Sequence, residues 1–142
     1  MLSKNLISQF LLKEDLSTYD PYDVWKSKCG ITVKQLYYKN KYIGIIPAGI
    51  ISLYDLYLNN RLRYGYIKQE YPIVRAQAAL ALINLYKQEG KKEYLEYANN
   101  HIDWLLSNSV KGYSGYCWGT GFKIVISEKL TYSEKTPFST NT

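Results

Sequence analysis

Apolar residues three or four positions apart give the first part of the chain a helical pattern. They predict an amphipathic helix from residue 2 to about residue 14. A second helix is expected to start at Pro21, because Asp20 can accept hydrogen bonds from its first amides and a proline fits the first turn. The stretch 24–39 should continue as a helix that is broken near Gly30.

A turn bounded by Asn40 and Gly44 should precede the next apolar stretch. Residues 45–58 then show helical spacing, and Pro47 is tolerable there because it falls in the first turn. The run 42–54 carries no charge, yet it falls short of the roughly 20 apolar residues of a spanning helix. We therefore expect a core helix or an interfacial segment.

The clearest prediction is a helical hairpin over residues 72–107. A polar, basic connection over 59–71 leads to Pro72, which restarts a helix. A single glycine, Gly90, then separates two helices of about five turns each. Two helices joined so closely form an antiparallel αα-hairpin.

The two helices of this hairpin have different faces. The first is apolar on nearly every side and leaves only a narrow polar stripe of Gln77, Asn84 and Gln88, which predicts burial between neighbours. The second helix is amphipathic. Its inner stripe is expected to be Leu95, Ala98, Ile102 and Leu105, and its outer stripe Lys92, Glu96, Asn99 and Asp103. The hairpin should therefore pair a buried inner helix with an outer partner.

The amino-acid composition changes after residue 108. Residues 111–122 are rich in glycine and aromatic side chains and too irregular for a helix. A short strand over 122–126 should pair with 130–132, and residues 136–142 form no predicted element. The fold class is therefore all-α, with antiparallel helical hairpins, a glycine- and aromatic-rich loop and a short β-hairpin near the C-terminus.

The composition fits one domain over residues 1–142, with N-terminal helices in 2–58, the hairpin in 72–107 and the loop and tail in 108–142. Hydrophobic residues make up 46% and aromatic residues 15%, which excludes a disordered chain. The 18 Lys and Arg against 12 Asp and Glu give a net charge of +6. That charge could attract an anionic membrane, nucleic acid or an acidic polymer, and it does not choose among them.

Cys29 and Cys117 have no second cysteine or histidine near either of them, so neither a metal site nor a disulfide framework is predicted. No cofactor is expected, and a reducing compartment is the simplest interpretation. The N-terminal segment carries Lys4 within its apolar stretch and lacks the layout of a secretory signal. We therefore expect a cytoplasmic protein.

Several short motifs, taken in order, resemble one family. They are Asp20-Pro-Tyr-Asp23 with Trp25, Leu36-Tyr-Tyr-Lys39, Tyr71-Pro72, Asn84-Leu-Tyr86, Tyr94-Leu95 and Gly112-Tyr-Ser-Gly-Tyr-Cys-Trp-Gly119. They are similar to the N-terminal part of bacterial polysaccharide-biosynthesis-associated proteins of the six-hairpin, glycosidase-like (α/α toroid) class. The Gly-Tyr-Cys-Trp-Gly element is the most specific of them.

The resemblance implies a carbohydrate-binding or carbohydrate-modifying protein of bacterial surface-polysaccharide metabolism. A closed toroid needs more hairpins than this chain supplies, so the resemblance implies an incomplete α/α toroid. That would be a truncated protein, one product of a split gene, or an open array that docks on a protein partner. In the family pattern an acidic residue follows Phe122, whereas here Lys123 follows, so no carboxylate is carried over and catalytic residues stay unassigned.

Arg75 is the first candidate substrate-binding residue. On a helical wheel it lies opposite the polar stripe of its helix, on an apolar side. A buried guanidinium needs a partner, because removing the charge from water costs several kcal/mol. That partner is either an internal carboxylate or carbonyl, or an anionic sugar or phosphate ligand.

Tyr113, Tyr116 and Trp118 are the other candidate substrate-binding residues. Flat rings on a glycine-rich loop can stack on sugars, and the resemblance places this loop beside the central cavity of the toroid. Alternatively, the rings fill the core beneath the loop.

The remaining polar residues receive no catalytic role. His101 is expected to be packed and hydrogen-bonded, and Asp103 lies on the solvent stripe. No nucleotide-binding loop and no suitably spaced carboxylate pair is present. The basic cluster Arg61, Arg63 and Lys68 is interpreted as a solvated surface, so nucleic acid is not an expected partner.

Two other functions compete with the carbohydrate hypothesis. The hairpin 72–107 has about the length of one tetratricopeptide repeat, which would suit a module that binds a protein partner, although no second copy follows at a fixed period. The other is a peripheral membrane protein that uses the segment 42–54 between the basic residues of 39–41 and 61–63.

Overall fold

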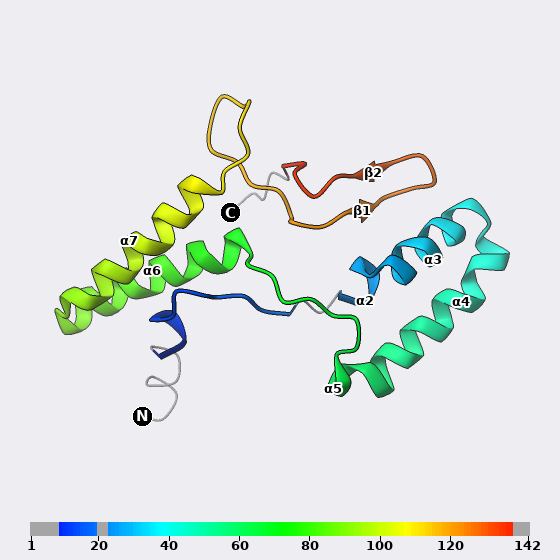
Figure 1. Ribbon diagram of the computed structural model, residues 1–142, viewed down its shortest axis with the longest axis horizontal. Coiled ribbons are helices and arrows are strands. Elements are labelled where there is room, and N and C mark those ends of the chain that lie inside the picture. Colours follow the sequence, from blue (N-terminus) through cyan, green and yellow to red (C-terminus); the bar gives the residue numbers. More distant parts are fainter. Residues whose placement is uncertain (1–8, 20–22, 138–142) are drawn as a thin grey trace. The chain divides into compact units, whose positions relative to one another are not determined.

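The computed structural model describes residues 9–19 and 23–137 (Figure 1). The described part is mostly helical and holds one two-stranded antiparallel sheet, which confirms the all-α class with a short β-hairpin. The expected helix start at Pro21 with its Asp20 cap lies outside the described residues, as do most of the first helix and the tail beyond residue 137.

The described chain groups into two compact units. Unit 1 contains residues 9–18, 69–120 and 137, and unit 2 contains residue 19 and residues 23–68 and 121–136. The assignment of residues 1–142 to one domain stays a prediction.

Unit 1 is built on the predicted helical hairpin. Helix α6 (Pro72–Glu89) starts with its proline in the first turn, and α7 (Lys92–Ser107) follows after two residues. Gly90 caps α6 with a φ of 69°, a left-handed conformation that favours glycine, and its amide donates to the Tyr86 carbonyl over 2.8 Å. The predicted hairpin and the glycine between its two helices are confirmed.

The core of unit 1 joins the N-terminal segment to both helices. Its buried members are Leu11, Leu16, Ala78, Leu82, Tyr94 and Ala98. The prediction that α6 is buried on nearly every side is wrong, because Ile73 and Leu80 are more than half exposed within the described chain. The buried stripe of α7 also differs from the expected one: it consists of Tyr94, Ala98 and His101, whereas Ile102 is exposed.

Unit 2 begins with two helices that meet at Ser27. Helix α2 (Asp23–Lys26) ends there and α3 (Lys28–Lys39) begins, because the Ser27 hydroxyl donates to the Val24 carbonyl over 2.6 Å and accepts from the Gly30 amide over 3.0 Å. The break expected near Gly30 is therefore three residues earlier. Gly30 lies inside α3, where a Cβ atom would overlap the Val24 carbonyl.

Helices α3 and α4 (Lys41–Tyr54) form the hairpin of unit 2 around a single residue, Asn40. The Asn40 side chain accepts from the amides of Tyr42 and Ile43, so α4 starts earlier than predicted. The expected turn up to Gly44 is wrong: Gly44 is a buried helical residue. Pro47 consequently lies in the second turn rather than the first.

A π-helical turn, η1 (Asp55–Asn59), continues α4, and α5 (Asn60–Leu62) ends the helical stretch. Arg63 then turns the chain with a left-handed φ of 52°. The buried Asn59 side chain fixes this turn, since it donates to the Tyr64 carbonyl over 3.0 Å and accepts from the Tyr64 amide over 2.6 Å. The helical prediction for 45–58 is confirmed with an added π-helical end.

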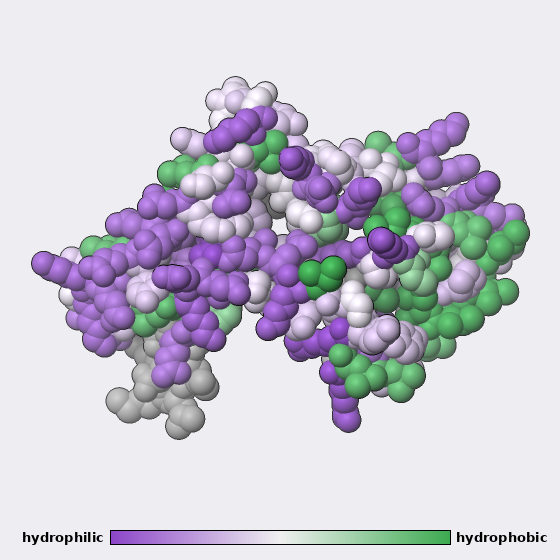
Figure 2. Space-filling model, viewed as in Figure 1, coloured by the Kyte–Doolittle hydropathy of each residue, from purple (hydrophilic) through white to green (hydrophobic). Residues whose placement is uncertain are grey.

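The core-helix alternative for this segment is wrong. Among the described residues, the stretch Lys41–Asn59 is one helix that is long and apolar enough to cross a bilayer by length and composition. Only 11% of its most apolar window is buried inside the described structure. Figure 2 shows the resulting apolar surface over α4.

The predicted β-hairpin is confirmed. Strand β1 (Ile124–Val125) pairs antiparallel with β2 (Thr131–Tyr132), with Val125 opposite Thr131. Val125 is buried, and β1 lies beside α3 within unit 2. The hairpin therefore covers part of α3.

We expect Gly44→Ala to destabilise the α3–α4 hairpin by about 2 kcal/mol, because the added Cβ atom would overlap the Cα atom of Tyr37. Gly49→Ala is the matched control in the same helix, since nothing lies within 4 Å of its Cβ position. That control should stabilise the chain by up to about 1 kcal/mol through helix propensity. Urea unfolding followed by circular dichroism measures both, and equal effects would contradict the close contact.

Candidate functional site

The aromatic loop after α7, residues 111–116, is closed at its base. The Val110 amide donates to the Cys117 carbonyl over 2.8 Å, and the Cys117 thiol lies 3.7 Å from the Val110 carbonyl oxygen. The Trp118 indole nitrogen donates to the carbonyl of Leu105 in the last turn of α7 over 2.7 Å. These bonds fix both ends of the loop next to the helix end.

The tip of the aromatic loop presents two rings to solvent. Tyr113 is 58% exposed and Tyr116 is 66% exposed. Neither makes a hydrogen bond or ring contact in the part of the chain that the structure describes. Gly112 has a φ of 97°, at which a side chain would be strained, so the path of the loop depends on it. Much of each ring is therefore accessible to a ligand, and neither hydroxyl is hydrogen-bonded within the described residues.

The three aromatic candidates therefore occupy two different places. Tyr113 and Tyr116 share the tip of the aromatic loop. Trp118 lies half-buried at its base and uses its only polar atom to bind Leu105. The alternative that rings fill the core beneath the loop thus matches the position of Trp118 better than that of the two tyrosines.

Arg75, the fourth candidate, lies at the centre of a polar network inside unit 1. Its side chain is 5% exposed and forms an ion pair with Glu70. It also donates to the Glu14 carbonyl over 2.5 Å and to His101 Nδ1 over 2.8 Å. The guanidinium carbon lies 5.0 Å from the centre of the Trp104 ring. The structure thus provides the internal partners that one interpretation of Arg75 requires.

His101 completes the network as a neutral ring. An arginine can only donate, so His101 Nδ1 must accept from Arg75. Nε2 then carries the proton and donates to the Leu11 carbonyl over 3.0 Å. The ring is fully buried and joins α7, α6 and the N-terminal segment.

The pattern of apolar positions predicts that the Arg75 side chain points into the protein. It does not identify the groups that accept hydrogen bonds from the guanidinium. Glu70 lies five residues before Arg75, just ahead of the helix start, and its carboxylate also accepts from the Leu16 amide over 3.2 Å. The Glu14 carbonyl lies 61 positions away in the sequence. Among the described residues, Arg75 Nε is a buried polar atom without a hydrogen-bond partner. Backbone acceptors at such separation leave no signal in the local sequence.

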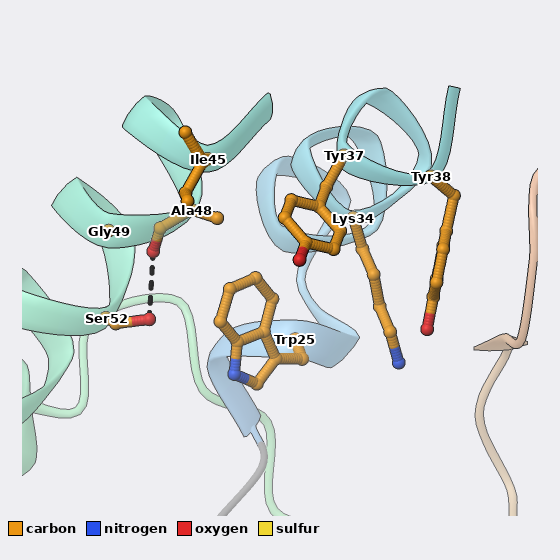
Figure 3. Close-up of a pocket in the computed structure, with 8 residues that line it drawn as sticks. All are labelled: Trp25, Lys34, Tyr37, Tyr38, Ile45, Ala48, Gly49 and Ser52. Atoms are coloured by element: carbon orange, nitrogen blue, oxygen red, sulfur yellow. Dashed lines mark hydrogen bonds between the residues drawn. The ribbon is translucent and has the colours of Figure 1, made fainter. Parts of the chain in front are cut away.

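Unit 2 contains an open groove of about 470 Å³ between its helices. The residues that line it come from α2, α3 and α4 and are Trp25, Lys34, Tyr37, Tyr38, Ile45, Ala48, Gly49 and Ser52. Figure 3 shows Tyr37 pointing toward Trp25 while Lys34 and Tyr38 extend side by side. The Lys34 ammonium group has no ion-pair partner in the described part of the chain. Sequence reasoning did not single out this groove.

The basic cluster of unit 2 is organised around one tyrosine ring. The Arg63 guanidinium carbon lies 4.5 Å and the Lys68 ammonium 5.5 Å from the centre of the Tyr19 ring. The Tyr66 ring lies 6.2 Å from the same ring, and its hydroxyl bonds to Asp55. These contacts order Arg63 and Lys68 within unit 2.

No group of three or more His, Cys, Asp or Glu side chains that could hold a metal ion occurs among residues 9–19 and 23–137. Both cysteines are free thiols. No family model matches the chain, and no curated protein or solved structure is significantly similar to it. A functional assignment therefore depends on the geometry of the aromatic loop.

We expect Arg75→Met to lower the free energy of unfolding by about 3 kcal/mol, because it leaves Glu70, the Glu14 carbonyl and His101 Nδ1 without their donor. Lys87→Met, on the exposed side of the same helix, should change it by less than about 0.5 kcal/mol. Urea unfolding monitored by circular dichroism measures the difference. An unchanged stability would favour the anionic-ligand interpretation of Arg75 instead.

Proposed function

We propose that the chain binds oligosaccharides through Tyr113 and Tyr116, as part of bacterial surface-polysaccharide metabolism. The observation that carries this proposal is the form of the aromatic loop: two exposed tyrosine rings stand on a loop whose base is hydrogen-bonded and anchored by Trp118. A sugar ring has an apolar face that can stack on an aromatic ring and hydroxyls that can bond to the two phenol groups.

The closed base supports binding for an entropic reason. Ordering a loop on association costs free energy, and a loop that is already held at both ends loses less freedom when a ligand arrives. The Val110–Cys117 hydrogen bond and the Trp118 anchor supply that constraint. The tyrosines themselves have only two rotatable side-chain bonds, so ordering them costs little.

The class of protein in this proposal follows from the sequence resemblance to α/α toroids of polysaccharide biosynthesis. Two antiparallel helical hairpins, α3–α4 and α6–α7, are consistent with a fold built from such hairpins. In this proposal the chain is an incomplete toroid, and a protein partner or further helical hairpins complete it. The reaction stays unassigned, because Lys123 occupies the position at which the family pattern has an acidic residue.

We expect Tyr113→Ala and Tyr116→Ala each to weaken oligosaccharide binding by about tenfold, the loss of one stacked ring of about 1.4 kcal/mol. Tyr64→Ala is the control, since that tyrosine is also more than half exposed but belongs to unit 2. Isothermal titration of the folded chain against acidic and neutral oligosaccharides gives the affinities. Absence of binding across the panel, or an equal effect of the control, would contradict the proposal.

A further inference from the structure

The apolar surface of α4 and η1 faces outward along one continuous side of the helix. Tyr42, Ile46, Ile50, Leu53 and Tyr57 follow each other at intervals of three or four residues, and all of them are more than half exposed. Ile43, Ile45, Leu56 and Leu58 widen this side and are also more than half exposed. Soluble monomers rarely expose a contiguous apolar patch of this kind.

The inward side of α4 carries smaller residues. Gly44 packs against the backbone of Tyr37, and Ala48 is half-buried one turn later. Most of the large aliphatic residues therefore lie on the side away from α3, and among them only Ile51 is half-buried on the inward side. This is the reverse of the usual pattern, in which the apolar stripe of a surface helix faces the core. The outward side, which we call the α4 surface, thus requires an apolar environment outside the unit.

The α3–α4 hairpin is also strongly cationic. Between Val24 and Tyr54 the sequence holds five lysines and no acidic residue. Lys28, Lys39 and Lys41 are exposed, and in the described part of the chain none of them has a carboxylate partner. Lys34 lines the groove together with Ile45, so an unpaired ammonium group borders the α4 surface directly. An environment that is apolar inside and negatively charged at its boundary matches both properties.

We propose that the α3–α4 hairpin docks on an anionic lipid bilayer, with the α4 surface lying in the plane of the interface. Interfacial helices bury an apolar side at the boundary of the acyl chains while nearby lysines pair with anionic headgroups. This proposal is independent of the oligosaccharide proposal, because it uses unit 2 rather than the aromatic loop of unit 1.

The interfacial position is favoured over a spanning one by the neighbour of α4. Helix α3 packs along α4 and carries Lys28, Lys34 and Lys39. A spanning α4 would draw these charges toward the hydrocarbon, where each is costly. A helix in the interface keeps the lysines at the headgroups.

The test is flotation of the full chain with vesicles of phosphatidylcholine, with and without phosphatidylglycerol. We expect co-flotation with the anionic vesicles, at least about tenfold weaker binding to phosphatidylcholine alone, and weaker binding at high salt. Ile46→Asp should weaken binding by about tenfold or more, and the pair Lys39→Gln and Lys41→Gln by about 20-fold. These residues are exposed, so circular dichroism should show unchanged helicity.

Matched controls lie in unit 1. Leu80→Asp replaces an exposed apolar residue of α6, and the pair Lys87→Gln and Lys92→Gln removes the same charge from α6 and α7. Both should leave flotation unchanged. The proposal is overturned if the chain stays at the bottom with both kinds of vesicle, or if the controls and the α4 variants behave alike.

A second copy of the chain and a spanning helix would each give a distinct result. A second copy of the chain would appear as a dimer in light scattering that Ile46→Asp dissociates, without flotation, and that result contradicts the bilayer proposal.

Bacterial expression of the full chain provides a second measurement. We expect the chain in the membrane fraction and its release by alkaline carbonate, whereas retention would mean a spanning helix and absence from membranes would overturn the proposal.

Discussion

The contact between Gly44 and the backbone of Tyr37 fixes the arrangement of unit 2. Because no Cβ atom fits between the two helices there, only the glycine side of α4 can face α3. The rotation of α4 about its axis follows from this constraint, and with it the outward position of Ile46, Ile50 and Leu53. Gly44 thereby determines which apolar side chains of α4 are exposed at the surface of unit 2.

The structure of unit 1 depends instead on the burial of a charged side chain. The Arg75 guanidinium can leave water because Glu70, His101 and the Glu14 carbonyl receive its donors. The same bonds tie the N-terminal segment to α6 and α7, so the network stabilises the hairpin from which the aromatic loop extends. If the loop binds oligosaccharides as proposed, that binding would depend on Arg75 through the stability of the hairpin.

The sequence predicted well those features whose causes are local. Pro72 and Gly90 mark the ends of α6 through their own backbone preferences, and the β-hairpin joins two segments that lie only a few residues apart in the sequence. Gly30 and Gly44 lie inside helices rather than at the break and the turn expected there, because their role depends on the approach of a neighbouring backbone. For the same reason an apolar pattern located α4 but did not reveal that its large residues face outward. In the candidate site, the loop composition indicated the aromatic residues, while the base position of Trp118 depends on its bond to Leu105.

We thus propose two binding surfaces of different chemistry: the exposed aromatic rings of unit 1 for a sugar, and the apolar and cationic side chains of unit 2 for an anionic bilayer. We propose that the α4 surface contacts an apolar phase outside the chain. Hydrogen–deuterium exchange of the full chain, with and without anionic vesicles, detects this contact. We expect slower exchange over residues 41–59 with vesicles and unchanged exchange over 72–107. Unchanged exchange over 41–59, or protection confined to 72–107, would contradict it.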